Sequence, residues 1–192
     1  MTSRLILPLL IALSLGACSA PAPQPDPLSQ ASAVSVTLPG FVTGPGTTLH
    51  WHSDLKWMDD PEGRYKRRAK VLQQALQREF ERKGYRFVEH AENPTYDVVA
   101  VALLGELKEQ EKLEQVFRLY PSLAAPAKGY GRGTILVAIS PTDTGDIVWR
   151  GALEVFTDPG HQPVEQRYKR LEWAAVKLLG SIPHLPPVAP VQ

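Results

Sequence analysis

Two segments of the chain repeat apolar residues every three or four positions, which is the spacing of one face of a helix. The first, residues 64–83, places apolar side chains at Ala69, Leu72, Leu76 and Phe80. Gly84 follows at once, where a helix C-cap is expected. The second, residues 162–179, does the same at Tyr168, Leu171, Ala175 and Leu178. The pattern therefore predicts two amphipathic helices, each with one face turned toward a core.

Other segments have the pattern of strands. Residues 96–104 (YDVVAVALL) and 133–139 (GTILVAI) are almost continuously apolar, which favours buried strands. Residues 146–156 alternate instead, with Arg150 and Glu154 opposite the apolar positions. A turn at 141–145 precedes this strand, so we expect an antiparallel hairpin with one wetted face. Residues 35–51 alternate loosely and predict one or two more strands, whereas residues 105–128 follow no single pattern.

The order of these elements indicates the fold class. Two helices cannot cover both faces of a sheet of about four to six strands, so they are expected to lie on one side. The sequence therefore predicts an α+β domain, with a mostly antiparallel sheet and two main helices packed on one face.

The N-terminus has the features of an export signal. It begins with one cation, Arg4, continues with an apolar run over residues 5–15 and ends in small residues before Cys18. The run is shorter than the roughly 20 apolar residues that a membrane span needs. Cys18 is the only cysteine of the chain, so the exported protein has no intramolecular disulfide and no thiolate metal site.

Leu15-Gly16-Ala17-Cys18 resembles the lipobox of bacterial lipoproteins. This resemblance implies diacylglycerol on the Cys18 sulfur, cleavage before Cys18 and usually a third acyl chain on the new amino terminus. The lipid bilayer is then a partner through acylated Cys18. Ser19 fits sorting to the periplasmic face of the outer membrane, with the inner membrane as the alternative.

The composition divides the rest of the chain. Residues 1–17 are the predicted signal peptide, and residues 18–36, rich in proline and alanine, are a predicted lipidated tether. Residues 37–183 are expected to form a single α+β domain, followed by a proline-rich tail at 184–192.

A second resemblance begins at the predicted hairpin. Residues 130–135 (YGRGTI), 143–145 (DTG) and 147–151 (IVWRG) resemble the family called domain of unknown function 4136, which are small Gram-negative envelope lipoproteins. Residues 82–85 (RKGY), 96–99 (YDVV) and a closing helix that runs into Ile182-Pro183 fit the same family. Ser140-Pro141 departs from it where an aspartate is usual, and residues 106–114 have no counterpart. The resemblance implies an envelope location and a fold, and no activity beyond lipidation.

The charge of the chain is nearly balanced, with 21 Lys+Arg against 20 Asp+Glu. Nucleic-acid-binding domains usually carry a clear basic excess, so we expect no nucleic acid partner. The first predicted helix is strongly basic, and its candidate binding surface consists of Arg64, Lys66, Arg67, Arg68, Lys70 and Arg78. Such a surface suits an envelope protein, a cell-wall polymer or anionic headgroups. The simpler alternative is a solvated helix face whose positive charge is offset by the acidic residues of segment 106–114.

His50 and His52 are the candidate metal ligands, although the sequence favours no metal site. Histidines at i and i+2 of a strand share one face and can hold a metal with a third ligand, for which Asp54, Asp59 and Asp60 are available. The alternative is a pair of surface histidines. The glycine-rich segment 129–133 lacks the lysine of a phosphate loop, and the chain has no Gly-x-Ser-x-Gly elbow.

We therefore expect a non-catalytic binding or assembly module of the cell envelope that needs no cofactor. The alternative is a periplasmic hydrolase or metal-dependent enzyme centred on His50 and His52.

Overall fold

The computed structural model describes residues 26–58, 60–105, 118–119, 121, 123, 129–158, 160 and 162–187. The predicted signal peptide, Cys18, Asp59 and the charged segment 106–114 lie outside the described residues.

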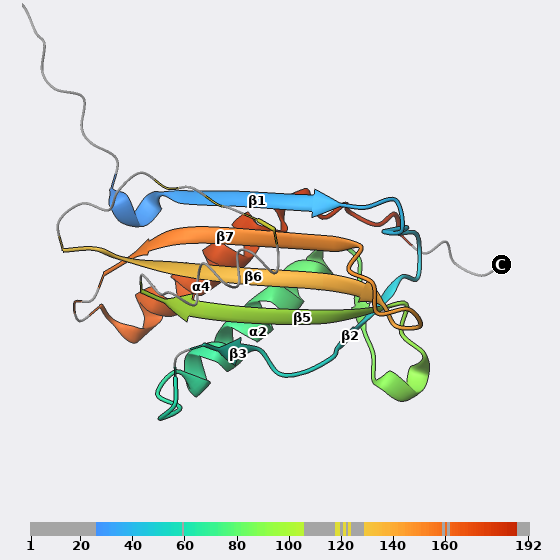
Figure 1. The fold of residues 1–192 in the computed structure, drawn as a ribbon, viewed down its shortest axis with the longest axis horizontal. Helices are drawn as coiled ribbons and strands as arrows, with labels where there is room; N and C mark the ends of the chain where they lie inside the picture. The colour runs from blue at the N-terminus through green and yellow to red at the C-terminus, as the bar shows by residue number, and fades with distance from the viewer. Residues whose placement is uncertain are drawn as a thin grey trace, which may run out of the picture.

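One sheet and two long helices make up the described part of the chain (Figure 1). The strands are β1 (Ala31–Thr37), β2 (Thr48–Trp51), β3 (Lys56–Trp57), β4 (Arg86–Phe87), β5 (Tyr96–Leu104), β6 (Gly131–Pro141) and β7 (Trp149–Thr157). The helices are α2 (Lys66–Arg82) and α4 (Val164–Leu178), and the short 3-10 turns are η1 (Pro27–Ser29), η2 (His90–Glu92) and η3 (Leu179–Ser181). Both predicted helices and the strand at 96–104 are thus confirmed. Among the described residues, no helix has the length and apolarity needed to cross a membrane.

The sheet is mixed, which corrects the prediction of a mostly antiparallel sheet. Its order is β1-β7-β6-β5-β2-β4, and β3 pairs with the same strand, β5, as β2 does. The first four strands of this order are antiparallel, whereas β2, β3 and β4 form parallel pairs. Parallel neighbours need a crossover connection. Helix α2 follows β3 and precedes β4, so it lies within the connection of every parallel pair: β2–β4, β2–β5 and β3–β5. The strands β2, β3 and β4 are too short to show an alternating pattern.

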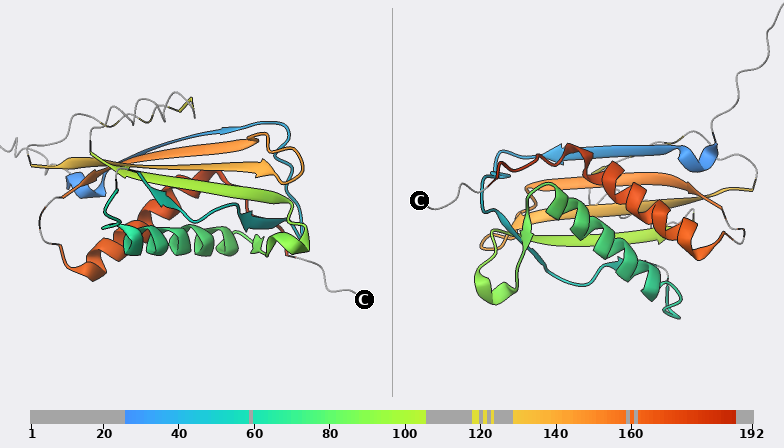
Figure 2. Two further views of the ribbon diagram at one scale, coloured as in Figure 1. Left: turned by 60° about the horizontal axis from the view of Figure 1, so that its bottom comes forward. Right: turned by 180° about the vertical axis from the view of Figure 1, so that it is seen from behind.

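Both helices lie on one face of the sheet (Figure 2), so the α+β class and this layering are confirmed. From α2, the side chains of Leu72, Leu76 and Phe80 are fully buried against this face. Their spacing of four residues is the one that the sequence pattern predicts. Leu178 of α4 and Val137 of β6 belong to the same core.

The opposite face of the sheet is also covered, so the predicted wetted face is wrong. Glu154 of β7 is only 1% exposed, and the neighbouring Leu136 and Ala152 are fully buried. These two residues form a second apolar cluster with Ala138 and Leu119. Because Leu119 belongs to the segment between β5 and β6, at least part of that segment packs on this face. The alternating pattern of the hairpin describes only the hairpin's own residues. It could not predict that another segment of the chain packs on this face.

The ordered domain begins earlier than the predicted boundary at residue 37. Strand β1 already starts at Ala31, and before it the Asp26 side chain accepts a hydrogen bond from the Leu28 amide at 2.9 Å. The Arg170 guanidinium of α4 donates to the carbonyl oxygens of Leu28 and Phe156, which ties this entry to the domain. β1 is rich in alanine and serine, as linkers are, so its composition did not predict a strand.

Gly151 lies where another residue has no room. A Cβ atom there would lie 2.5 Å from Cη2 of Trp149 and 3.2 Å from Cδ1 of Leu178. The Trp149 side chain is fully buried, so it cannot move aside into solvent. The absence of a side chain at Gly151 is therefore the reason that β7 can carry a tryptophan under α4.

We expect Gly151→Ala to lower the free energy of unfolding by about 1–3 kcal/mol, the usual cost of overpacking a core. Chemical denaturation monitored by circular dichroism measures the change. Gly180→Ala is the matched control, because no atom lies within 4 Å of its Cβ position; it should alter stability by under about 0.5 kcal/mol. Equal losses in both variants would contradict the packing argument.

Candidate functional site

His50 and Asp97 meet across two parallel strands. The register of β2 on β5 places His50 beside Asp97, and the His50 Nδ1 atom lies 2.8 Å from the Asp97 Oδ1 atom. Both side chains are mostly buried, with exposed fractions of 20% and 13%. His52 points to the same carboxylate, since its Nδ1 lies 3.5 Å from Asp97 Oδ2 and its side chain is 66% exposed. One carboxylate therefore faces two imidazoles, one on each oxygen.

His90 brings a third imidazole to this carboxylate. Its ring centroid lies 5.3 Å from that of His50, and one potential metal-binding atom from each of His50, His90 and Asp97 lies within 4.8 Å of the other two. His90 opens η2, whose N-terminus is closed by a capping box between Glu89 and Glu92. The exposed imidazole is thus presented by a turn with its own local hydrogen bonds.

Among the described residues, those that lie near enough to His50 to share a metal ion are His90 and Asp97, and not the predicted third ligands. Of the three predicted third ligands, Asp60 instead accepts hydrogen bonds from the amides of Arg64 and Tyr65, both at 2.7 Å, at the start of α2. Asp54 does not join the His50 cluster, and Asp59 lies outside the described residues. Asp97 escaped notice because it lies inside an apolar run, 47 positions after His50. Only the strand pairing brings the two together.

This cluster supports two kinds of chemistry. Imidazole nitrogens with a carboxylate oxygen form a donor set that suits divalent transition metals. A carboxylate beside an imidazole also fixes the tautomer of the ring, as general bases require. A hollow of about 740 Å³, bordered by His90, Tyr96 and Thr142, adjoins the cluster and leaves room for a small ligand.

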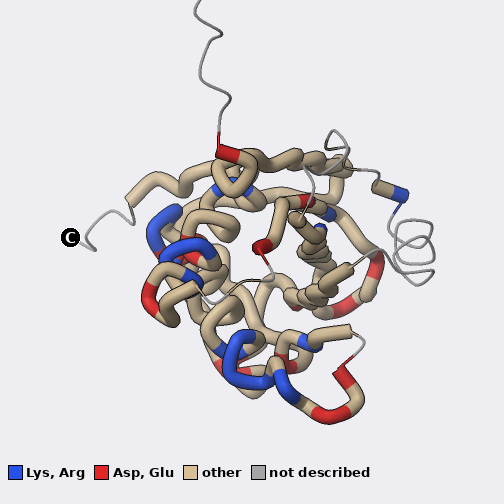
Figure 3. The backbone as a smooth tube through the Cα atoms, turned by 90° about the vertical axis from the view of Figure 1, so that its left-hand side faces the viewer, with Lys and Arg blue, Asp and Glu red and all other residues tan. Residues whose placement is uncertain are grey.

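Basic and acidic positions are interspersed along the described backbone (Figure 3). The candidate basic surface lies on α2 and just before it, and several of its cations already have partners. Arg64 pairs with Glu62 at 3.2 Å and Arg78 pairs with Glu172 of α4 at 2.9 Å. The guanidinium carbons of the other two arginines lie over aromatic rings, Arg67 at 6.0 Å from the Tyr168 centroid and Arg68 at 5.0 Å from that of Tyr65. The two ion pairs offset the charge of Arg64 and Arg78, whereas the aromatic rings leave the charge of Arg67 and Arg68 in place.

Lys83, the residue directly after α2, is buried and adds no charge to the exposed basic surface. Its side chain is 4% exposed, and its ammonium donates a hydrogen bond to the Ile182 carbonyl at 2.9 Å. Desolvation lowers the pKa of this lysine, and the nearby Glu79 carboxylate opposes the shift. The backbone carbonyl of Lys83 also accepts from the Leu185 amide at 2.7 Å, so the lysine holds the start of the proline-rich tail.

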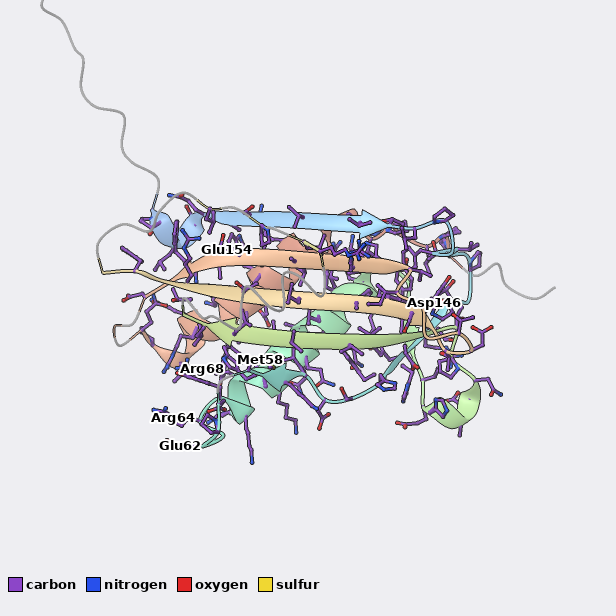
Figure 4. The ribbon with its side chains drawn as sticks, viewed as in Figure 1. Met58, Glu62, Arg64, Arg68, Asp146 and Glu154 are labelled. Atoms are coloured by element: carbon purple, nitrogen blue, oxygen red, sulfur yellow. The ribbon has the colours of Figure 1, made fainter. Side chains whose placement is uncertain are left out.

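A surface groove of about 770 Å³ separates β3 from the first turns of α2. The charged residues that line the groove are three cations, Lys56, Lys66 and Lys70, and two acids, Asp54 and Asp60. The remaining lining residues are Leu55, Trp57, Met58, Gly63, Ala69, Gln73, Gln74 and Gln77. Figure 4 shows Met58, Arg64 and Arg68 around this region. Lys66 and Lys70 are thus the members of the predicted basic surface that line a concave feature.

The face opposite the helices contains a buried ion pair. Arg132 of β6 donates to Glu154 of β7 at 2.7 Å, and the second Glu154 oxygen accepts from the Leu123 amide at 2.8 Å. Arg132 is 23% exposed, whereas Glu154 is almost completely enclosed. The pair therefore connects the segment that follows β5 to the central strands.

We expect Glu154→Ala to lower the free energy of unfolding by about 3 kcal/mol, since removing one member of a buried pair leaves the other charge poorly solvated. Urea denaturation measures it. Glu165→Ala, which breaks the exposed pair with Lys169, is the control, with an expected loss of under about 0.5 kcal/mol. A loss for Glu154→Ala as small as that of the control would contradict this description.

Comparisons with known proteins show only distant structural likeness. No family model matches the chain, and no curated protein matches it. Two structures of the PelC dodecamer from Paraburkholderia phytofirmans align with TM-scores of 0.44 and 0.42 at 9% and 11% identity. They cover 78% of this chain and 99% and 98% of their own. A "putative lipoprotein" from Caulobacter crescentus aligns with a TM-score of 0.28 at 18% identity, over 64% of this chain and 77% of its own.

Proposed function

We propose that this chain is a bacterial envelope lipoprotein, acylated at Cys18, whose domain works as a non-catalytic binding or assembly module. The observation that carries the proposal is the Leu-Gly-Ala-Cys motif at residues 15–18 after a short apolar run. Asp26, which caps η1, comes only eight residues after Cys18 (26 − 18). At about 3.1 Å per residue, this linker reaches roughly 25 Å. The anchored domain then stays close to the bilayer surface.

The arrangement of the domain supports a role for the basic surface near the membrane. The chain enters through η1 at one end of the long axis, and the start of α2, with Arg64 and Arg68, lies at that same end (Figures 1 and 4). A short linker at this end holds the α2 cations near acidic headgroups and near partners at the membrane surface. We assign the protein to the periplasmic face of the outer membrane, with the inner membrane as the alternative.

The partner that we propose for the groove between β3 and α2 is an acidic surface of an envelope protein or a cell-wall polymer. Lys66 and Lys70 line this groove, and both side chains are exposed. Lysines at the border of an interface mainly attract and orient an oppositely charged partner.

The lipid anchor is tested by Cys18→Ser. The wild-type protein should fractionate with membranes, and its N-terminal peptide should carry the mass of a diacylglycerol and an amide-linked acyl chain. The variant should lack this mass and remain uncleaved or become soluble, because two or more acyl chains are needed for stable anchoring. A wild-type N-terminus without lipid, determined by mass spectrometry, would contradict the proposal.

The binding role is tested by cross-linking in cells from a photoreactive residue placed at Gln74, which lines the groove and is exposed. Reversal of Lys66 and Lys70 to glutamate should reduce the specific adduct about tenfold or more, since like charges across an interface are strongly unfavourable. Reversal of Arg86 and Lys177, two exposed cations outside the groove, alters the net charge equally and should preserve the adduct. Identical adducts in both variants would refute an electrostatic contact at the groove.

A second candidate function is a periplasmic hydrolase or metal-dependent enzyme centred on His50 and His52. The metal-dependent form is favoured because Asp97 lies beside both histidines and His90 lies beside His50. This form requires a bound metal.

A further inference from the structure

We propose that His50, His90 and Asp97 form a binding site for a divalent transition-metal cation of the zinc class. The proposal depends on neither the lipid anchor nor the basic surface, so failure of one leaves the other intact. The first observation that supports a metal site is that the histidines of the chain are clustered. The chain has five histidines, and three of them, His50, His52 and His90, surround the single carboxylate of Asp97.

The donor set fits such a cation. Zinc binds imidazole nitrogen and carboxylate oxygen at about 2.0–2.2 Å, so the ligands of a tetrahedral ion lie roughly 3.4 Å apart. Here one potential ligand atom from each residue lies within 4.8 Å of the others. The closing movement, at most about 1.4 Å, can be made by His90, the exposed member, which is carried by the three-residue turn η2 rather than by a strand.

The two less exposed ligands are held by the sheet. β2 and β5 share backbone pairs at Leu49–Tyr96, His50–Asp97 and Trp51–Val98, so the His50–Asp97 pair has a paired neighbour on each side. On the face toward α2, the Trp51 indole donates to Gln77 at 3.2 Å and stacks on Phe87 at a centroid distance of 5.3 Å. These contacts fix the strand on which His50 and His52 alternate with Trp51. A site on rigid strands is preorganised for its ligand.

His52 has a different role from the three ligands. Its Nδ1 atom lies 3.5 Å from the second carboxylate oxygen of Asp97, while its ring is mostly in solvent. From there it orients the carboxylate toward the ion, as partners outside the coordination sphere commonly do. The fourth position of the ion is then left to water or to a small ligand. The hollow bordered by His90 and Thr142 adjoins the cluster.

The test is calorimetric titration of zinc chloride into the untagged, unlipidated mature chain carrying Cys18→Ser, so that no free thiol competes for zinc. We expect one ion per chain with a dissociation constant in the micromolar range or below. Bound zinc should also raise the melting temperature, because a ligand that binds only the folded state stabilises it.

Variants distinguish this site from other histidines. His90→Ala and Asp97→Asn should each weaken zinc binding by at least about tenfold, and His52→Ala should weaken it by less than either of them. His184→Ala, an exposed histidine outside the cluster, is the matched control and should bind as the parent does. Because His90 is exposed on a short turn, its variant keeps the fold, and circular dichroism verifies this for all four.

Two results would overturn the proposal. One is the absence of stoichiometric zinc binding by the folded parent. The other is a dissociation constant that stays the same in His90→Ala and in Asp97→Asn, which would place any bound zinc elsewhere in the chain.

Discussion

The parallel pairing of β2 with β5 is the constraint on which the most distinctive features of this molecule depend. It extends an antiparallel sheet with strands that run alongside β5, and it therefore needs the crossover that α2 provides. The same register sets His50 beside Asp97 on one face of the sheet. On the other face it places Trp51 against α2 through Gln77. Without this pairing the histidines of β2 would have no carboxylate partner.

The basic residues around the start of α2 and the histidine cluster lie at opposite ends of the domain. At one end the chain enters through η1, where Arg170 binds the carbonyl oxygens of Leu28 and Phe156, and the basic start of α2 lies at that same end. The His50–Asp97 pair belongs to the opposite end of the strands, since β5 begins at Tyr96 and continues toward Leu104 at the entry end. Asp97 and Leu104 are seven residues apart along β5, a separation of roughly 23 Å. If Cys18 is acylated as we propose, the histidine end lies at the end of the domain far from the anchor.

Local sequence patterns predicted the elements well and their partners poorly. The spacing of Leu72, Leu76 and Phe80 predicted α2 because one helix face alone determines that pattern. The direction of β2 was not predictable, because four residues of strand carry too little alternation and pairing depends on segments far apart in the chain. For the same reason the sequence identified His50 and His52 but missed Asp97 and His90. Glu154, predicted to be wetted, is enclosed through contacts from the segment that follows β5.

The most direct test of the claim that this register builds a metal site is a crystal structure of the zinc-soaked protein, with diffraction data recorded above and below the zinc absorption edge. The account predicts one strong anomalous peak within bonding distance of His50, His90 and Asp97, with β2 paired to β5 as described. A map without a peak at this cluster, or with its strongest peak on other residues, would contradict the account.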